Sequence, residues 1–342
     1  MTARLVRPLG GSLGLLIAAT AAVPRPARAD LPRDTPTAIE VDRAAAPGGR
    51  VGFGFDGGEP VDAWGASLAL GWLERPIELT AGALGGGSPA SQPVRRRETL
   101  ALGGALAVGD RVVVDAVLRA SHQVGDRLTA GGNPDHLARF VAHDLQLGGR
   151  IRIAGDRERA ALLRAELTLP TGDDAQFAGD AAWTAAWSLI GRLALPRGIA
   201  LAATAGIRLH GTEVAIGDQL IGDELFAAAG GAVPLAALGL GGVGGGAADR
   251  VALTAELRAA LGDSVGGASA PSPVEARLGA LVSVLPELTI AARAGVGLDD
   301  QIGAPRLRAT LELAWTPRVA RPEPGRAPAV PGDEPDDDPD EP

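Results

Sequence analysis

Charged residues alternate with apolar residues along much of this 342-residue chain, and these are the side chains whose types and spacing could do chemistry. All 32 basic residues are arginine, and eleven arginines and six acids fall on the polar positions of the alternating stretches. Guanidinium groups bind carboxylates and other anions through paired hydrogen bonds. The pattern therefore predicts a polar surface with five more cations than anions.

The candidate residues for this surface are expected to share the face of their strands that is turned away from lipid. An arginine that faces lipid at the middle of the bilayer costs about 2–4 kcal/mol. They are Arg119, Arg150, Arg152, Arg164, Glu166, Arg192, Arg208, Glu256, Arg258, Arg277, Arg293, Arg306, Arg308 and Glu312, with Glu78, Asp115 and Glu275 as further acids. Two interpretations stay open. The charges pair across strands and brace an interior, or they line a lumen and set its preference for anions.

Other chemistry has little support. The chain has no cysteine, which excludes disulfides and thiolate metal sites. No two of its four histidines are closer than seven residues, so a helical His-x-x-x-His metal pair is excluded. Asp135-His136 and His143-Asp144 could form an acid–base or metal pair, but solvated loop residues are the simpler interpretation. We therefore predict no catalytic residues, no cofactor and no metal site, and we do not expect an enzyme.

The elements that must position these charges are predicted to be β-strands. Between residues 50 and 315 the apolar residues recur with a period of two, as in Leu307, Ala309, Leu311 and Leu313, whereas a helix would scatter them. Strands of about 9–12 residues have the length of transmembrane β-strands. The expected strands are 50–55, 63–73, 77–84, 97–107, 111–120, 144–153, 159–169, 183–195, 199–209, 223–233, 250–261, 274–285, 288–297 and 305–315.

Fourteen strands joined alternately by short turns and longer loops predict an all-β fold, a transmembrane antiparallel up-and-down β-barrel. The glycines of 50–55 and of 239–246 leave twelve strands as the alternative. A soluble β-sandwich or open sheet is the rival, because its strands also alternate. Aromatic residues are only 3% of the chain, fewer than membrane barrels usually carry at their rims. The tryptophans nevertheless fall near strand ends, at Trp64, Trp72, Trp183, Trp187 and Trp315.

The two ends of the chain differ from this body. Residues 1–29 read as a cleaved signal peptide, with Arg4 and Arg7 before a short apolar run and small residues at Ala27 and Ala29. Residues 30–47 are expected to be a periplasmic segment and 48–316 the barrel. Residues 317–342, rich in proline and acids, are expected to be a disordered periplasmic tail. The net charge of −9 argues against a nucleic-acid partner.

Several short motifs resemble those of OmpA-related outer-membrane proteins from GC-rich Gram-negative bacteria. They are Leu167–Gly172 with Phe177–Asp180, Ile221–Leu225, and Gly303–Arg308 leading to Trp315, within a resemblance that spans roughly residues 36–316. It implies an outer-membrane barrel, similar also to transporters of hydrophobic compounds. In that family the barrel is often followed by calcium-binding repeats and a peptidoglycan-binding domain. No Asp-x-Asp-x-Asp-Gly loop is present here, so peptidoglycan binding is not carried over.

These observations predict a passive channel or transporter for small or hydrophobic solutes in the outer membrane of a Gram-negative bacterium. Its partners would be outer-membrane lipid and the solutes, with the tail in the periplasm. The alternative is a non-conducting structural barrel that anchors the envelope or a periplasmic partner. Whether the lumen is open distinguishes the two.

If the arginine surplus sets ion preference, replacing Arg306 and Arg308 by glutamate should reverse it. The reversal potential of the channel under a salt gradient measures this preference. An unchanged reversal potential would contradict the hypothesis.

Overall fold

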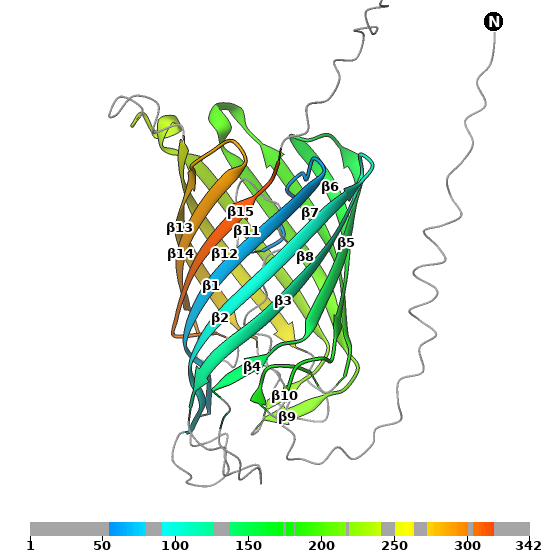
Figure 1. Ribbon diagram of the computed structural model, residues 1–342, viewed down its shortest axis with the longest axis vertical. Coiled ribbons are helices and arrows are strands. Elements are labelled where there is room, and N and C mark those ends of the chain that lie inside the picture. Colours follow the sequence, from blue (N-terminus) through cyan, green and yellow to red (C-terminus); the bar gives the residue numbers. More distant parts are fainter. Residues whose placement is uncertain are drawn as a thin grey trace, which may run out of the picture.

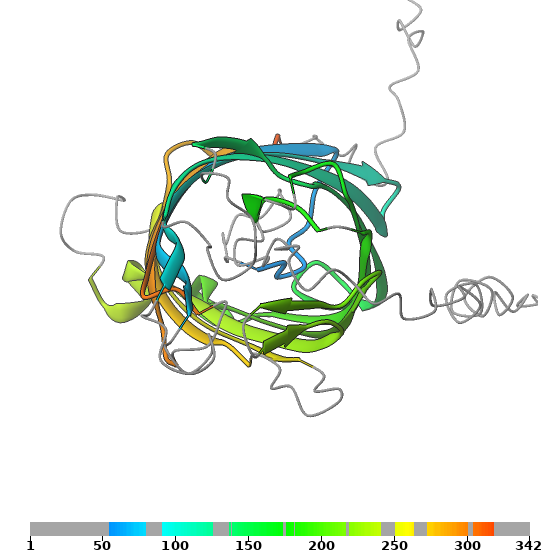
Figure 2. The same ribbon diagram turned by 90° about the horizontal axis from the view of Figure 1, so that it is seen from below.

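The computed structural model describes residues 55–79, 91–125, 137, 139–173, 176–180, 182–216, 219–240, 250–262, 272–299 and 304–317. Twelve antiparallel strands close into one barrel (Figures 1 and 2), because β2 pairs with β1 on one side and with β3 on the other. In order around the barrel they are β1 (Trp64–Leu79), β2 (Ser91–Val108), β3 (Val112–Val124), β5 (Leu145–Gly155), β6 (Arg159–Leu169), β7 (Thr184–Ala194), β8 (Ala200–His210), β11 (Glu224–Pro234), β12 (Val251–Gly262), β13 (Val274–Ser283), β14 (Leu288–Gly297) and β15 (Leu307–Trp315).

The all-β antiparallel barrel is thus confirmed, with the alternative number of strands. The stretches expected as two strands, 63–73 and 77–84, form the single strand β1. The expected turn between them is a shift of register between Glu74 and Ile77, with Arg75 at a φ of 49°. Such a bulge bends a strand without ending it. The other missing strand, 50–55, lies outside the described residues except for Phe55, which is not in a strand.

Three further short strands are not among the twelve strands that close the barrel. β9 (Val214–Ile216) and β10 (Gln219–Ile221) form a small hairpin of their own between β8 and β11. β4 (Phe140–Ala142) pairs with β3 beyond the end of β5. Two 3-10 turns, η3 (Pro196–Gly198) and η4 (Leu235–Leu238), follow β7 and β11. Among the described residues, no helix is long and apolar enough to span a bilayer.

The connections differ between the two ends of the barrel. At one end, called the short-turn end, β2–β3, β5–β6 and β13–β14 are joined by turns of a few residues. Asp156 shapes one of these turns by accepting the backbone N–H groups of Arg159 and Glu158, which hold the pKa of its carboxyl below the ordinary value. The first residue of β1 and the last of β15 lie at the same end, because Ala66 pairs with Trp315. The longer loops gather at the opposite end, the loop end (Figure 1).

The two faces of the barrel wall have opposite compositions. Many large apolar side chains of the strands are exposed, among them Leu102, Leu118, Leu253, Leu257 and Leu278. The buried side chains include many arginines, acids, threonines and glutamines. A water-soluble protein buries its apolar residues and seldom exposes a continuous apolar band. A closed sheet with an apolar outer face is the arrangement of a membrane-spanning barrel, and it excludes the soluble sandwich.

The outward face of β13 provides a test of lipid contact. Leu278 lies in the middle of the strand and is 69% exposed, so the substitution Leu278→Arg should lower the free energy of unfolding in lipid vesicles by about 2–4 kcal/mol. Leu285 lies in the turn between β13 and β14, and Leu285→Arg should cost no more than about 1 kcal/mol. Equal costs for the two variants, measured by denaturant titration, would argue against a lipid-facing wall.

Candidate functional site

The segment before β1, residues 55–63, crosses the inside of the barrel (Figure 2). We call residues 55–63 the strut. At one end the carbonyl of Ala63 accepts the N–H of Ala107 in β2. At the other end Phe55 forms a buried apolar cluster with alanines of β8 and β11: Ala200, Ala202, Ala228 and Ala232. In the circular strand order β8 lies six places from β1 in either direction, so the strut reaches the opposite wall.

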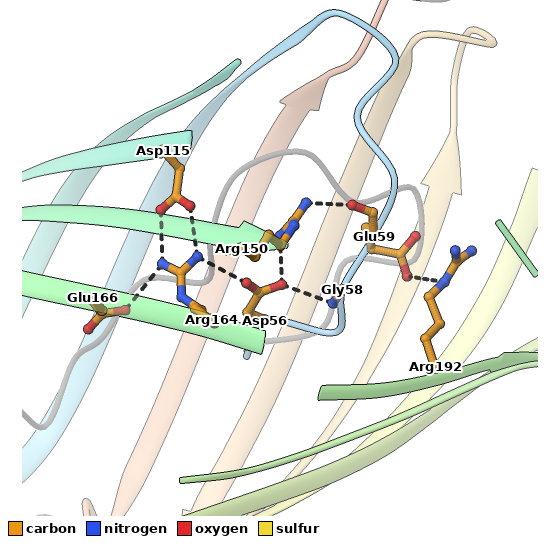
Figure 3. A network of polar contacts seen from close by, with 8 residues as sticks. All are labelled: Asp56, Gly58, Glu59, Asp115, Arg150, Arg164, Glu166 and Arg192. Carbon is orange, nitrogen blue, oxygen red and sulfur yellow. Dashed lines mark hydrogen bonds and ion pairs between the residues drawn. The ribbon is translucent and has the colours of Figure 1, made fainter. Parts of the chain in front are cut away.

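Asp56 fixes the strut to the wall. Its Oδ1 accepts a hydrogen bond from Nη1 of Arg150 at 2.7 Å, and its Oδ2 accepts one from Nη1 of Arg164 at 3.1 Å (Figure 3). The N–H of Gly58 donates to Oδ1 as well, at 2.9 Å. Burial alone would raise the pKa of Asp56, but the charges of Arg150 and Arg164 and the Gly58 N–H outweigh it and hold this pKa below its ordinary value.

Further ion pairs extend this contact along β3, β5, β6 and β7. Arg164 donates two hydrogen bonds to Asp115, at 2.7 and 2.9 Å, and one to Glu166, at 3.2 Å. Arg150 donates to the carbonyl of Glu59, and the Glu59 carboxylate lies 3.6 Å from Nε of Arg192. We call Asp56, Glu59, Asp115, Arg150, Arg164, Glu166 and Arg192 the strut network. Between the strut and the turns beside it, a cavity of only about 50 Å³ is left.

A second group of charges lies on β12 to β15, the strands opposite β3 to β7 in the circular order. Glu275 accepts hydrogen bonds from Arg277 and from Arg308, each at 2.7 Å. Arg293 lies 3.1 Å from Glu312 and 3.4 Å from Glu256. With Arg258 of β12, this group, the arginine wall, comprises Glu256, Arg258, Glu275, Arg277, Arg293, Arg308 and Glu312. It holds four arginines and three glutamates.

A third polar group lies toward the loop end, where β4 and β5 meet. The pairs Ala120–Ala142 and Val117–Gln146 are out of register by one residue, so β4 continues β5 across a bulge at residues 143 and 144. The bulge leaves both His143 and Asp144 buried. Strict alternation would have turned one of them outward.

These two residues hold neighbouring chain segments. His143 bonds to the Ser121 hydroxyl at 2.7 Å, and the two carboxylate oxygens of Asp144 accept the N–H groups of Gly172 and Asp180, each at 2.7 Å. The Asp144 oxygens are therefore engaged by backbone, which is a structural role. The other candidate pair, Asp135-His136, lies outside the described residues. Within the described ranges, no group of three His, Asp or Glu could hold a metal ion.

Arg97 holds the loop between β6 and β7 in the same region. Its guanidinium donates to the carbonyl of Phe177 at 2.7 Å and to Gln123 at 3.0 Å. Gln123 in turn donates to the carbonyl of Gln176. A loop that carries Phe177 at a φ of 57° is thus fixed against side chains of β2 and β3.

The structure places the predicted polar residues as follows. Twelve of them lie in the strut network or the arginine wall: Arg150, Arg164, Glu166, Arg192, Glu256, Arg258, Arg277, Arg293, Arg308, Glu312, Asp115 and Glu275. Arg119 is buried in β3, Arg208 pairs with Glu224 and lies over the ring of Phe226, and Arg152 donates to the carbonyl of Asp110. Arg306 is exposed and precedes β15, and nothing is described of the Glu78 side chain. A role of these residues in a pore stays a prediction.

Sequence reasoning missed the acids that come from outside the barrel strands. Asp56 and Glu59 lie in the strut, which the pattern did not distinguish from an irregular first strand and its loop. They change the local charge, because Arg150, Arg164 and Arg192 face two acids in the wall but four once the strut is counted. The only sequence signal was an acid on either side of the Gly57-Gly58 pair.

No protein family matches the sequence, and a search of curated proteins found no match. Among solved structures, the chain is similar to an outer-membrane channel from Pseudomonas putida F1, with a TM-score of 0.51 and 16% identity over 75% of this chain and 96% of that one. The NanC porin gives a TM-score of 0.46 with 4% identity, covering 74% of this chain and all (100%) of that chain. The KdgM porin in complex with disordered oligogalacturonate gives 0.43 with 5% identity, covering 74% and 99%.

The fold is therefore that of outer-membrane β-barrel channels. At this level of identity the likeness concerns the fold alone. The relation to OmpA-related proteins expected from the short motifs stays a prediction.

The shared carboxylate of the arginine wall offers a test of how the interior is held. Glu275→Gln should leave two buried arginines short of a counter-charge and lower the free energy of unfolding by about 3–5 kcal/mol. Glu98→Gln is the matched control, since Glu98 is 40% exposed and pairs with Arg96 at 3.4 Å, and it should cost at most about 1 kcal/mol. Denaturant titration of both variants in detergent micelles measures the difference, and similar values would mean that the wall is not held by its ion pairs.

Proposed function

We propose that this protein is a passive channel of the Gram-negative outer membrane for small solutes, with a lumen that favours anions. The observation that carries the proposal is the pair of charged groups, the strut network and the arginine wall, on opposite sides of a twelve-stranded barrel. Side chains just fill a barrel of about eight strands, so twelve strands enclose more space. The fold likeness to an outer-membrane channel supports the same class.

The preference for anions follows from the arginine wall. It carries four arginines against three glutamates, which leaves one positive charge on its side of the confined interior. The strut network, with three arginines against four acids, carries one negative charge on the opposite side, so the proposed preference for anions belongs to the side that the arginine wall lines. Charges in such a position attract counter-ions more strongly than the same charges in bulk water. Rings and patches of arginine select anions in this way.

The orientation of the proposed channel follows from its two ends. Outer-membrane barrels have short turns on the periplasmic side and longer loops outside. The strut, the first strand and the last strand would then start or end in the periplasm, as would the acidic tail 317–342. We keep the cleaved signal peptide 1–29 and the periplasmic segment 30–47 as parts of this proposal.

A non-conducting structural barrel is the second candidate. It is favoured by the strut and by the loop segment that Arg97 and Asp144 hold, because both place chain across or against the interior. Conductance separates the two candidates directly.

The test is planar-bilayer recording of the refolded chain, residues 30–342, under a salt gradient. We expect stable conductance steps with a reversal potential on the anion side. Arg258→Glu changes the arginine wall from one net positive to one net negative charge and should shift the reversal potential toward cations, with Arg258→Gln in between. Arg197→Glu, in the exposed turn η3, is the control and should change nothing. A silent bilayer with confirmed insertion would favour the structural barrel.

A further inference from the structure

We propose that Arg150 and Arg164 form a binding site for the carboxylate of a small solute, and that Asp56 occupies this site as an internal competitor. The inference deepens the proposed channel function and rests on it, because the site lies inside the barrel. It adds a class of solute, monocarboxylates with a short apolar body, and a moving part, the strut.

The geometry is that of carboxylate recognition. Each oxygen of Asp56 is held by a different arginine, at 2.7 Å from Arg150 and 3.1 Å from Arg164. A solute carboxylate offers the same two oxygens. Nε of Arg150 is buried and has no hydrogen-bond acceptor within the described part of the chain, so one more donor is present than Asp56 uses. Guanidinium donors suit this task because their planar fork matches a carboxylate.

The Arg164 half of the site would persist without Asp56. Arg164 is anchored by two hydrogen bonds to Asp115 and by Glu166, all of which belong to barrel strands. A donor that is already oriented loses little freedom when a ligand binds. Without the two strut carboxylates, Arg150, Arg164 and Arg192 face only Asp115 and Glu166. The charges on strands β3 to β7 then sum to a net positive charge, which attracts an anion.

The residue beside Asp56 indicates what the rest of the solute would be. Phe55 lies on four alanines of β8 and β11, a smooth apolar surface that its departure would uncover. A solute with an apolar chain next to its carboxylate would cover the same surface while its charge takes the place of Asp56. Hexanoate, whose alkyl chain is slightly smaller than the Phe55 side chain, is therefore the probe.

The strut can move away from the barrel strands because no β-ladder joins it to them. Residues 55–63 contain no β-strand, so side-chain contacts and a few single backbone hydrogen bonds hold them in place, and no ladder. Such a segment can move without unpairing the strands around it. A solute that binds only when the strut has moved is weakened in proportion to the time that the strut is in place.

Equilibrium dialysis of labelled hexanoate against the refolded chain in detergent micelles tests the site without requiring conductance. Asp56→Asn, which removes the competing charge, should bind hexanoate at least about tenfold more tightly than the wild type. Asp62→Asn is the matched control on the same strut, because Asp62 pairs with Arg157 outside the site, and it should bind like the wild type. Hexanamide, which lacks the charge, should not bind Asp56→Asn. Equal binding by wild type and Asp56→Asn, or equal binding of hexanamide, would overturn the proposal.

A second measurement leaves both arginines and Asp56 unchanged. Because the chain has no cysteine, Pro60→Cys places a single thiol on the strut. Saturating hexanoate should speed its reaction with a maleimide several-fold, and an unchanged rate would contradict displacement of the strut. Hexanoate binding without conductance would support the carboxylate site and refute the channel. Conductance without hexanoate binding would support the channel and refute the carboxylate site.

Discussion

The structure depends on one constraint: a closed barrel that turns its apolar face to lipid must place its charges inside, where each needs a partner. An unpaired buried charge costs several kcal/mol, more than most single contacts contribute. The interior therefore consists of shared ion pairs, in which Glu275 serves Arg277 and Arg308, and Arg164 serves Asp56, Asp115 and Glu166. The apolar outer face and the paired inner face are two consequences of the same closure.

This constraint also explains why chain from outside the wall enters the barrel. Within the described part of the chain, Asp56 of the strut is the carboxylate that pairs with Arg150, at 2.7 Å. At the loop end the bulge at residues 143 and 144 does the opposite, since it turns two consecutive polar side chains inward and so gives backbone N–H groups of the next loop an acceptor. Each end of the barrel interior is thus completed by a segment that is distant in sequence.

The strands of the barrel could be predicted from the sequence, but the chain segments and contacts inside the barrel could not. A period of two records only which side of a strand a residue faces, and β5 to β8 and β11 to β15 follow it closely because nothing but lipid and interior acts on them. β1 was divided in two because Glu74-Arg75-Pro76 has the composition of a turn, yet pairing with β2 continues beyond these residues and carries the strand through them as a bulge. Asp56 and His143-Asp144 were missed or assigned to solvent because their environment is set by contacts across the barrel, which no local pattern encodes.

The two arginines that hold Asp56 differ in how far they depend on the strut, and this difference allows a solute to replace the strut at one of them. Arg164 keeps two wall acids whether or not Asp56 is present, whereas Arg150 depends on the strut for both its carboxylate and its carbonyl partner, Asp56 and Glu59. Removing the strut would therefore leave one arginine ordered and one in need of an anion. Any anion that arrives, whether from the chain or from solution, meets the same requirement, so the contact that stabilises the closed interior is also the contact that a solute can replace.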